Sequence, residues 1–251
     1  MDFPNKNDGM IKPVIYCLSS ILFLVCLQGT FPETVNSSPV YPSIAQKIPS
    51  DKQLLLNGRI WYNEYSKAFG DQFFLSNTFL KGSVTFNGRK YNNLDLLYDI
   101  ANDELILSFE TYPVIIMNKE MVDSFSLVFH NKVYNFNNYG TDTCDVLKGY
   151  VHVLYSGTSA LYVKYDKKLQ LLAVDGRYDL FYQEHNIYLS TDDEIILMPG
   201  RKKFLRLLED KQKEIRSYLN KSRLKLIRKN PETFIPVIKY YDSLKNEILH
   251  K

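Results

Sequence analysis

Residues 79–129 read FLKGSVTFNGRKYNNLDLLYDIANDELILSFETYPVIIMNKEMVDSFSLVF, and this stretch decides the fold of the 251-residue chain. Asn87-Gly88 separates Val84 and Phe86 from Tyr91. A two-residue hairpin turn of type I′ needs positive φ at both central positions, which Asn and Gly tolerate best. Apolar and polar residues alternate on both sides of the turn, so one face of each run is expected to meet a core and the other water. The stretch therefore predicts an antiparallel β meander.

The same pattern extends over residues 51–199, which are expected to form one β domain. Asn57-Gly58 lies within a strand-like run at 55–61, Asn102-Asp103 is a second turn, and 119–122 forms one helical turn. Ser156-Gly157 joins a further hairpin. Short runs follow at 169–174, 178–183, 186–190 and 194–198. A spacing of about 8–12 residues between turns predicts a sandwich, a rolled sheet or an open barrel, and the pattern does not choose among these.

The period changes after Pro199-Gly200, and residues 200–251 are expected to be helical. One amphipathic helix of about five turns is predicted from apolar residues at helical spacing. These residues are Phe204, Leu208, Ile215 and Leu219. A second helix is predicted to begin with Asn230 as its N-cap and Pro231 at its first position. Its apolar stripe comprises Ile238, Tyr241, Leu244 and Ile248. The expected class is mainly β, of the α+β type, with two C-terminal amphipathic helices.

Residues 1–29 have the pattern of a signal peptide. Lys6 and Lys12 precede an apolar run at 14–27, which has the length of a signal-peptide core and is shorter than the roughly 20 apolar residues of a membrane-spanning helix. Residues 30–50 are rich in Pro and Ser and predict an extended linker. We therefore expect export to the periplasm or beyond the cell, with no transmembrane span in the mature chain. A lipid anchor through Cys26 and an uncleaved N-terminal anchor are the alternatives.

No catalytic, cofactor-binding or metal-binding residue is predicted. The sequence lacks a phosphate-binding glycine loop, a Gly-x-Ser-x-Gly elbow and a His-Glu-x-x-His helix.

His152 alternates with Val151 and Val153, which favours a solvated or core imidazole over a catalytic base. Two acidic clusters, Asp192-Asp193-Glu194 and Asp142 with Asp145, are typical of turns. Cys144 is the only cysteine beyond residue 29, so no internal disulfide is expected. Trp61, the single indole, is expected to pack in the core.

Charge is divided unevenly along the chain. Residues 200–251 hold 15 Lys and Arg against 6 Asp and Glu, whereas residues 30–199 hold 14 against 20. One interpretation is that basic helices dock on an acidic sheet domain with their charged faces in solvent. The other is that the helices contact an acidic surface, such as anionic lipid or a polyanion. Nucleic acid fits an exported protein poorly.

Several segments resemble a group of small exported proteins of Bacteroidota. They are Tyr65-Ser66-Lys67 with Gly70, the run at 80–86 with Gly88 and Tyr91, the run at 96–100 with Asp103-Glu104-Leu105, and the basic tail from Arg201 to Tyr241. The resemblance covers about residues 54–245. It implies a bacterial source, export and a β-sheet body with basic C-terminal helices, and it implies no activity.

These observations favour an exported cell-envelope protein that is a non-enzymatic structural or partner-binding module. One alternative is a carrier that holds a small apolar ligand among its 19 Tyr and 15 Phe residues. Another is a hydrolase whose catalytic residues meet only in three dimensions.

Overall fold

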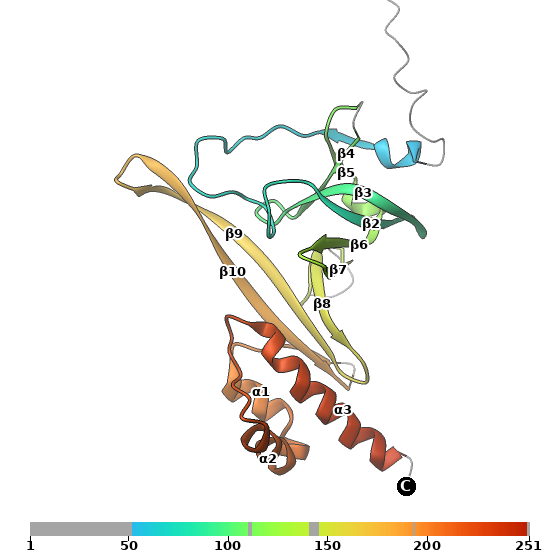
Figure 1. Ribbon diagram of the computed structural model, residues 1–251, viewed down its shortest axis with the longest axis vertical. Coiled ribbons are helices and arrows are strands. Elements are labelled where there is room, and N and C mark those ends of the chain that lie inside the picture. Colours follow the sequence, from blue (N-terminus) through green and yellow to red (C-terminus); the bar gives the residue numbers. More distant parts are fainter. Residues whose placement is uncertain (1–51, 110–111, 141–145, 193, 250–251) are drawn as a thin grey trace, which may run out of the picture. The chain divides into compact units, whose positions relative to one another are not determined.

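The computed structural model describes residues 52–109, 112–140, 146–192 and 194–249 (Figure 1). Within them, eleven strands form one antiparallel sheet in the order β1-β5-β4-β3-β2-β6-β7-β8-β9-β10-β11. Their bounds are β1 Gly58–Ile60, β2 Leu80–Phe86, β3 Arg89–Asp99, β4 Glu104–Ser108, β5 Ile115–Met117, β6 Val122–Phe129, β7 Lys132–Asn138, β8 Tyr150–Ser156, β9 Ala160–Val174, β10 Tyr178–Thr191 and β11 Glu194–Leu197. The sheet is open, with β1 and β11 as its edges. The predicted class, a sheet-dominated α+β fold, is therefore confirmed.

Several predicted features lie outside the described residues. They are the signal segment, the linker, Cys26, Asp142, Cys144, Asp145, Asp193 and the side chain of Ile248.

The β2–β3 hairpin forms as predicted. Asn87 has φ of 49° and Gly88 has φ of 74°, and Phe86 pairs with Arg89 across the turn. Val84, Phe86 and Tyr91 are buried. The turn geometry and the alternation therefore agree on the register next to the turn, which holds as far as the shift between Gly82 and Ser83.

Aromatic side chains dominate the core under β2–β8. Phe125 and Phe136 stack with ring centroids 4.7 Å apart, and Tyr98 and Tyr150 meet them edge to face at 5.1 Å and 5.0 Å, respectively. Phe74 enters the same core from the loop before β2. Aromatic pairs in these geometries contribute about 0.5–1.5 kcal/mol each beyond the area that they bury.

The prediction of separate short runs at 169–174, 178–183 and 186–190 is wrong. β9 and β10 are continuous strands that form one long hairpin (Figure 1). The polar residues that suggested a break are solvent-facing partners: Lys168 pairs with Glu184 across the hairpin at 2.7 Å. Most side chains in this part of the hairpin are exposed or only half-buried, so polar residues are suitable there.

The prediction of one five-turn helix after Gly200 is also wrong. The segment forms α1 Arg201–Leu207, the 3₁₀ turn η4 Glu209–Lys211 and α2 Gln212–Ser222. The four predicted apolar residues are nonetheless buried, at 0–4% exposure. Asp210 in the break accepts a hydrogen bond from Tyr241 Oη at 3.1 Å. Tyr218 of α2 stacks on Tyr240 of the last helix at 4.3 Å, so the break directs α2 onto that helix.

The last helix begins with the 3₁₀ turn η5 Pro231–Phe234 and continues as α3 Ile235–Leu249. Pro231 occupies the first helical position as predicted, but the Asn230 side chain makes no capping hydrogen bond. Pro236 is tolerated because it lies in the first turn of α3, where backbone donors lack helical partners. Ile238 and Tyr241 are buried against Leu161, Val163 and other residues of the sheet.

At the start of the described chain, residues 55–56 are not a strand. They lie in the 3₁₀ turn η2 Gln53–Leu56, and only β1 joins the sheet, against β5. The helical turn predicted at 119–122 is present as η3 Lys119–Met121. In the part of the chain that is described, no helix has both the length and the apolarity needed to cross a membrane.

Candidate functional site

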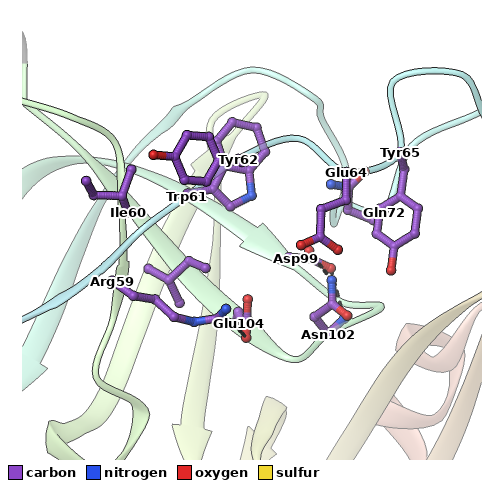
Figure 2. A pocket seen from close by; sticks show the side chains of 11 residues that line it. Arg59, Ile60, Trp61, Tyr62, Glu64, Tyr65, Gln72, Asp99, Asn102 and Glu104 are labelled. Carbon is purple, nitrogen blue, oxygen red and sulfur yellow. Dashed lines mark hydrogen bonds and ion pairs between the residues drawn. The ribbon is translucent and has the colours of Figure 1, made fainter. Parts of the chain in front are cut away.

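A polar cleft lies beside the turn between β3 and β4 (Figure 2). Its cavity has a volume of about 190 Å³, and a second cavity of about 380 Å³ adjoins it. The two cavities share Arg59, Asn102, Glu104 and Ile116 as lining residues. We call the smaller cavity and its lining the β3–β4 cleft. Its lining is Arg59, Ile60, Trp61, Tyr62, Glu64, Tyr65, Gln72, Asp99, Asn102, Glu104 and Ile116.

The floor of the β3–β4 cleft is set by Asp99, the last residue of β3, which is 1% exposed. One of its carboxylate oxygens accepts the backbone N–H groups of Ala101 at 2.9 Å and Asn102 at 3.0 Å, and the other accepts Asn102 Nδ2 at 2.9 Å. Burial raises the pKa of Asp99, although these three donors oppose the rise. The carboxylate therefore holds the turn, and one of its roughly four acceptor positions is left for a further donor.

Arg59 and Glu104 form an ion pair between β1 and β4 at the boundary of the two cavities. Because each charge is matched, the pair leaves little net charge at this boundary. Glu64, by contrast, is exposed and forms no ion pair within the described residues.

Gln72 and Trp61 also line the β3–β4 cleft. Gln72 is only 3% exposed, and its backbone carbonyl accepts the N–H of Ile100 at 3.0 Å. Its side-chain amide has no hydrogen-bond partner within the described chain. Trp61 is half-buried and packs on Phe73 at 6.0 Å. Trp61 therefore packs partly against the core, as predicted, and it also lines the cleft.

Next to the larger cavity lies a charged cluster around Asp103. Its carboxylate contacts Lys119 Nζ at 2.6 Å and Lys164 Nζ at 2.7 Å, and it accepts Tyr98 Oη at 2.6 Å. Burial alone would raise the pKa of Asp103, but Lys164 and the hydrogen bonds outweigh it, so the pKa is lowered. Gly149 has φ of 65°, and a Cβ there would collide with this carboxylate. The chain therefore closes over Asp103 only with glycine at this position.

His152 is a core residue, one of the two expected alternatives. It is 3% exposed, stacks on Phe136 at 5.1 Å and lies with Nδ1 3.4 Å from Tyr165 Oη. Burial, with a smaller contribution from Lys132, lowers its pKa to about 4. The imidazole is therefore neutral at ordinary pH, and no acidic side chain of the described ranges contacts it to activate it as a base.

The described residues assemble no catalytic constellation at the β3–β4 cleft. Of its three carboxylates, Asp99 holds the turn and Glu104 pairs with Arg59, which leaves Glu64. No serine, cysteine or histidine lines this cleft. No group of three or more His, Cys, Asp or Glu residues suited to a metal ion occurs within the described ranges. The arrangement suits binding of a polar molecule.

The C-terminal segment presents a second candidate surface, which we call the basic helical face. It comprises Arg201, Lys202, Lys203, Arg206, Lys211, Lys213, Arg216, Lys221, Arg223, Lys225, Arg228 and Lys229. All are exposed except Lys203 and Lys211, which are half-buried. None of them forms an ion pair with any other residue that the structure describes. The three acidic residues among them are Glu209, Asp210 and Glu214.

The helices are held on the sheet by two acid contacts. Asp242 of α3, 4% exposed, accepts Tyr155 Oη at 2.9 Å and the Ser159 N–H at 3.1 Å. Lys245 pairs with Asp192 at 2.8 Å, so this member of the predicted acidic turn serves as an ion-pair partner. One acid of the sheet region, Asp192, therefore meets α3, and one acid of α3, Asp242, meets the sheet. The cations of α1 and α2 form no ion pair with any residue that the structure describes.

Sequence reasoning missed Gln72, Asp99, Asp103 and Lys164. Asp103 had been read only as a turn residue, and its lysine partners lie 16 and 61 positions away in the sequence. No local pattern could have revealed a cluster with such separations. No protein-family model, curated protein or solved structure matches the chain.

Proposed function

We propose that this protein is an exported, non-enzymatic module of the cell envelope that binds an anionic surface through the basic helical face. The observation that carries the proposal is the set of twelve cations that form no ion pair with any residue in the part of the chain that the structure describes. The apolar sides of α1 and α2 are buried, so the charged sides are held outward on a fixed scaffold. Each Lys or Arg near an anionic membrane contributes about 1 kcal/mol of attraction.

A lipid surface is favoured over a soluble polyanion by a shallow groove formed by residues of α2, η5 and α3. The groove, about 590 Å³ in volume, is lined by Tyr218, Ile235, Pro236, Lys239 and Tyr240 with Glu232. Tyrosines next to cations suit the boundary between lipid headgroups and acyl chains. The groove thus adds a shallow apolar contact to the electrostatic attraction.

The test compares two variants of the full chain that lose the same charge. The helix variant carries Lys202→Gln, Arg206→Gln, Lys213→Gln and Arg216→Gln. The control variant carries Lys67→Gln, Arg89→Gln, Lys90→Gln and Arg177→Gln, all exposed positions of the sheet region. Deleting the helices would be a poor test, because their removal exposes Leu161, Val163 and the rest of the core that they cover.

Binding to vesicles of phosphatidylglycerol and phosphatidylcholine is measured by co-sedimentation at low and high salt. We expect the helix variant to bind at least about tenfold more weakly than the control variant, and raised salt to weaken binding by the unaltered chain. Equal binding by the two variants would refute the proposal.

The exported location is a separate part of the proposal and rests on the signal-like residues 1–29. Its test is N-terminal sequencing of the protein recovered from its native cells. Recovery from the envelope or medium with a start near residue 30 supports export. Recovery from the cytosol with the first residues intact argues against it.

A further inference from the structure

The β3–β4 cleft has features that the basic helical face does not explain. Gln72 is the most informative, because the residue is only 3% exposed, lines the cavity and forms no side-chain hydrogen bond with another described residue. Neither of its amide atoms is among the buried side-chain atoms that lack a partner, so both ends of the amide are open to the cavity. A ligand that displaces solvent from this amide must replace the hydrogen bonds that the solvent makes.

The polar groups around Gln72 indicate what such a ligand offers. Figure 2 shows Glu64, Tyr65 and Gln72 gathered near Asp99 and Asn102. The two amides each have a donor end and an acceptor end, and the carboxylates accept only. Hydroxyl groups both donate and accept, so one ligand rich in hydroxyls can satisfy all of them. An ammonium ion donates only and would leave the Gln72 amide N–H groups unpaired.

Charge argues against an anionic ligand in the same place. Arg59 is already paired with Glu104, and Glu64 and Asp99 are the remaining charged residues of the lining. A phosphate or carboxylate would meet two acidic side chains with no free cation to offset them. The ligand is therefore expected to be neutral.

The aromatic residues of the cleft and the volume of its cavity also fit a neutral ligand rich in hydroxyl groups. Trp61, Tyr62 and Tyr65 all line the cleft, and Tyr62 is 73% exposed. Exposed aromatic planes offer an apolar surface with a polar tip. The 190 Å³ cavity holds the volume of about six water molecules, at ~30 Å³ each. That is the scale of one sugar ring, and the adjoining 380 Å³ cavity leaves room for a second.

We infer that the β3–β4 cleft binds a neutral saccharide, with Gln72, Asp99 and Asn102 hydrogen-bonding its hydroxyl groups and Tyr62 stacking on its ring. The site is independent of the proposed anionic-surface binding, because it lies on β1, β3, β4, β5 and the loop after β1, outside residues 201–229.

The test uses saturation-transfer NMR with the full chain and, as separate probes, glucose, galactose, mannose and N-acetylglucosamine, followed by an array of neutral glycans. Choline and inorganic phosphate are the cationic and anionic comparisons. We expect transfer to at least one neutral sugar and none to choline or phosphate. Lack of binding to every neutral sugar and glycan, or binding of choline or phosphate alone, would overturn the inference.

Substitutions of lining residues test whether the sugar binds in the β3–β4 cleft. Gln72→Met keeps the length of the side chain and removes its polar ends, and Tyr62→Ala changes a residue too exposed to endanger folding. Each should weaken sugar binding at least about fivefold, as expected for a lost hydrogen bond or ring contact. Tyr178→Ala removes an exposed tyrosine of β10 that does not line the cleft and should leave binding unchanged. If Tyr62→Ala and a folded Gln72→Met both bind sugar as strongly as the unaltered chain does, the proposed site is contradicted. Helix variants with weak vesicle binding but normal sugar binding would separate the two functions.

Discussion

Replacement of His152 by Phe should make the stability of the protein less sensitive to acid. The imidazole is 3% exposed among aromatic rings, and its pKa is lowered to about 4 by burial and by Lys132. In the unfolded chain the pKa of histidine is about 6.5. The unfolded chain therefore takes up a proton in a pH range where the folded chain does not.

The sign and size of the effect follow from this difference in pKa. Where the unfolded state binds more protons, stability falls as the pH falls. The contribution of His152 is thus fully favourable above about pH 6.5 and is lost progressively toward about pH 4. At about 1.4 kcal/mol for each pH unit, the total loss is limited to about 3 kcal/mol, and about 2 kcal/mol of it is already lost at about pH 5.

The measurement is urea unfolding at about pH 7.5 and about pH 5, followed by the fluorescence of Trp61, the only indole in the chain. We expect the unaltered protein to lose roughly 2 kcal/mol more than His152→Phe between these two conditions. The comparison cancels the titration of all other groups. His152→Gln serves as a second variant should the larger Phe ring disturb packing, and His130→Gln at an exposed position is the matched control. A pH dependence that is the same in the unaltered protein and both His152 variants would refute the reasoning.

Three further predictions concern residues that hold the fold. Asp103→Asn leaves two partly exposed lysines without their carboxylate and should lower the free energy of unfolding by about 1–3 kcal/mol in urea titrations; no measurable loss would contradict the role of the cluster. Gly149→Ala should destabilise more than Gly176→Ala, since both glycines have positive φ but only Gly149 lacks space for a Cβ; equal unfolding midpoints would count against this account. Asp242→Ala should cost about 2–3 kcal/mol by leaving its buried donors unpaired, whereas Asn246→Ala on the exposed side of α3 should change thermal unfolding little; similar losses would show that Asp242 does not anchor the helix.

Local signals in the sequence predicted much of the sheet correctly. Asn87-Gly88 and Asn102-Asp103 are turns, and the flanking alternation places Val84 and Phe86 on the core side. These predictions succeeded because turn preference and alternation depend on residues within a few positions of one another.

The errors came where distant contacts outweighed local pattern. The polar run before Leu169 suggested a break, yet β9 continues because Lys168 pairs with Glu184 and Lys167 pairs with Asp71. The predicted single helix is interrupted near Asp210, which contacts Tyr241. In each case the deciding partner lies at least 16 residues away in sequence.

The sequence by itself determined the class of fold, the change from strands to helices near Pro199 and the excess of positive charge that follows it. These properties depend on composition and short-range periodicity. Only the tertiary structure decided that Gln72 lines a cavity beside Asp99 and that Asp103 meets Lys119 and Lys164. It also decided that the cations of α1 and α2 form no ion pair with another described residue. The physical reason is that hydrogen bonds, ion pairs and burial act between side chains that neighbour one another in space, and chain order says little about which these will be.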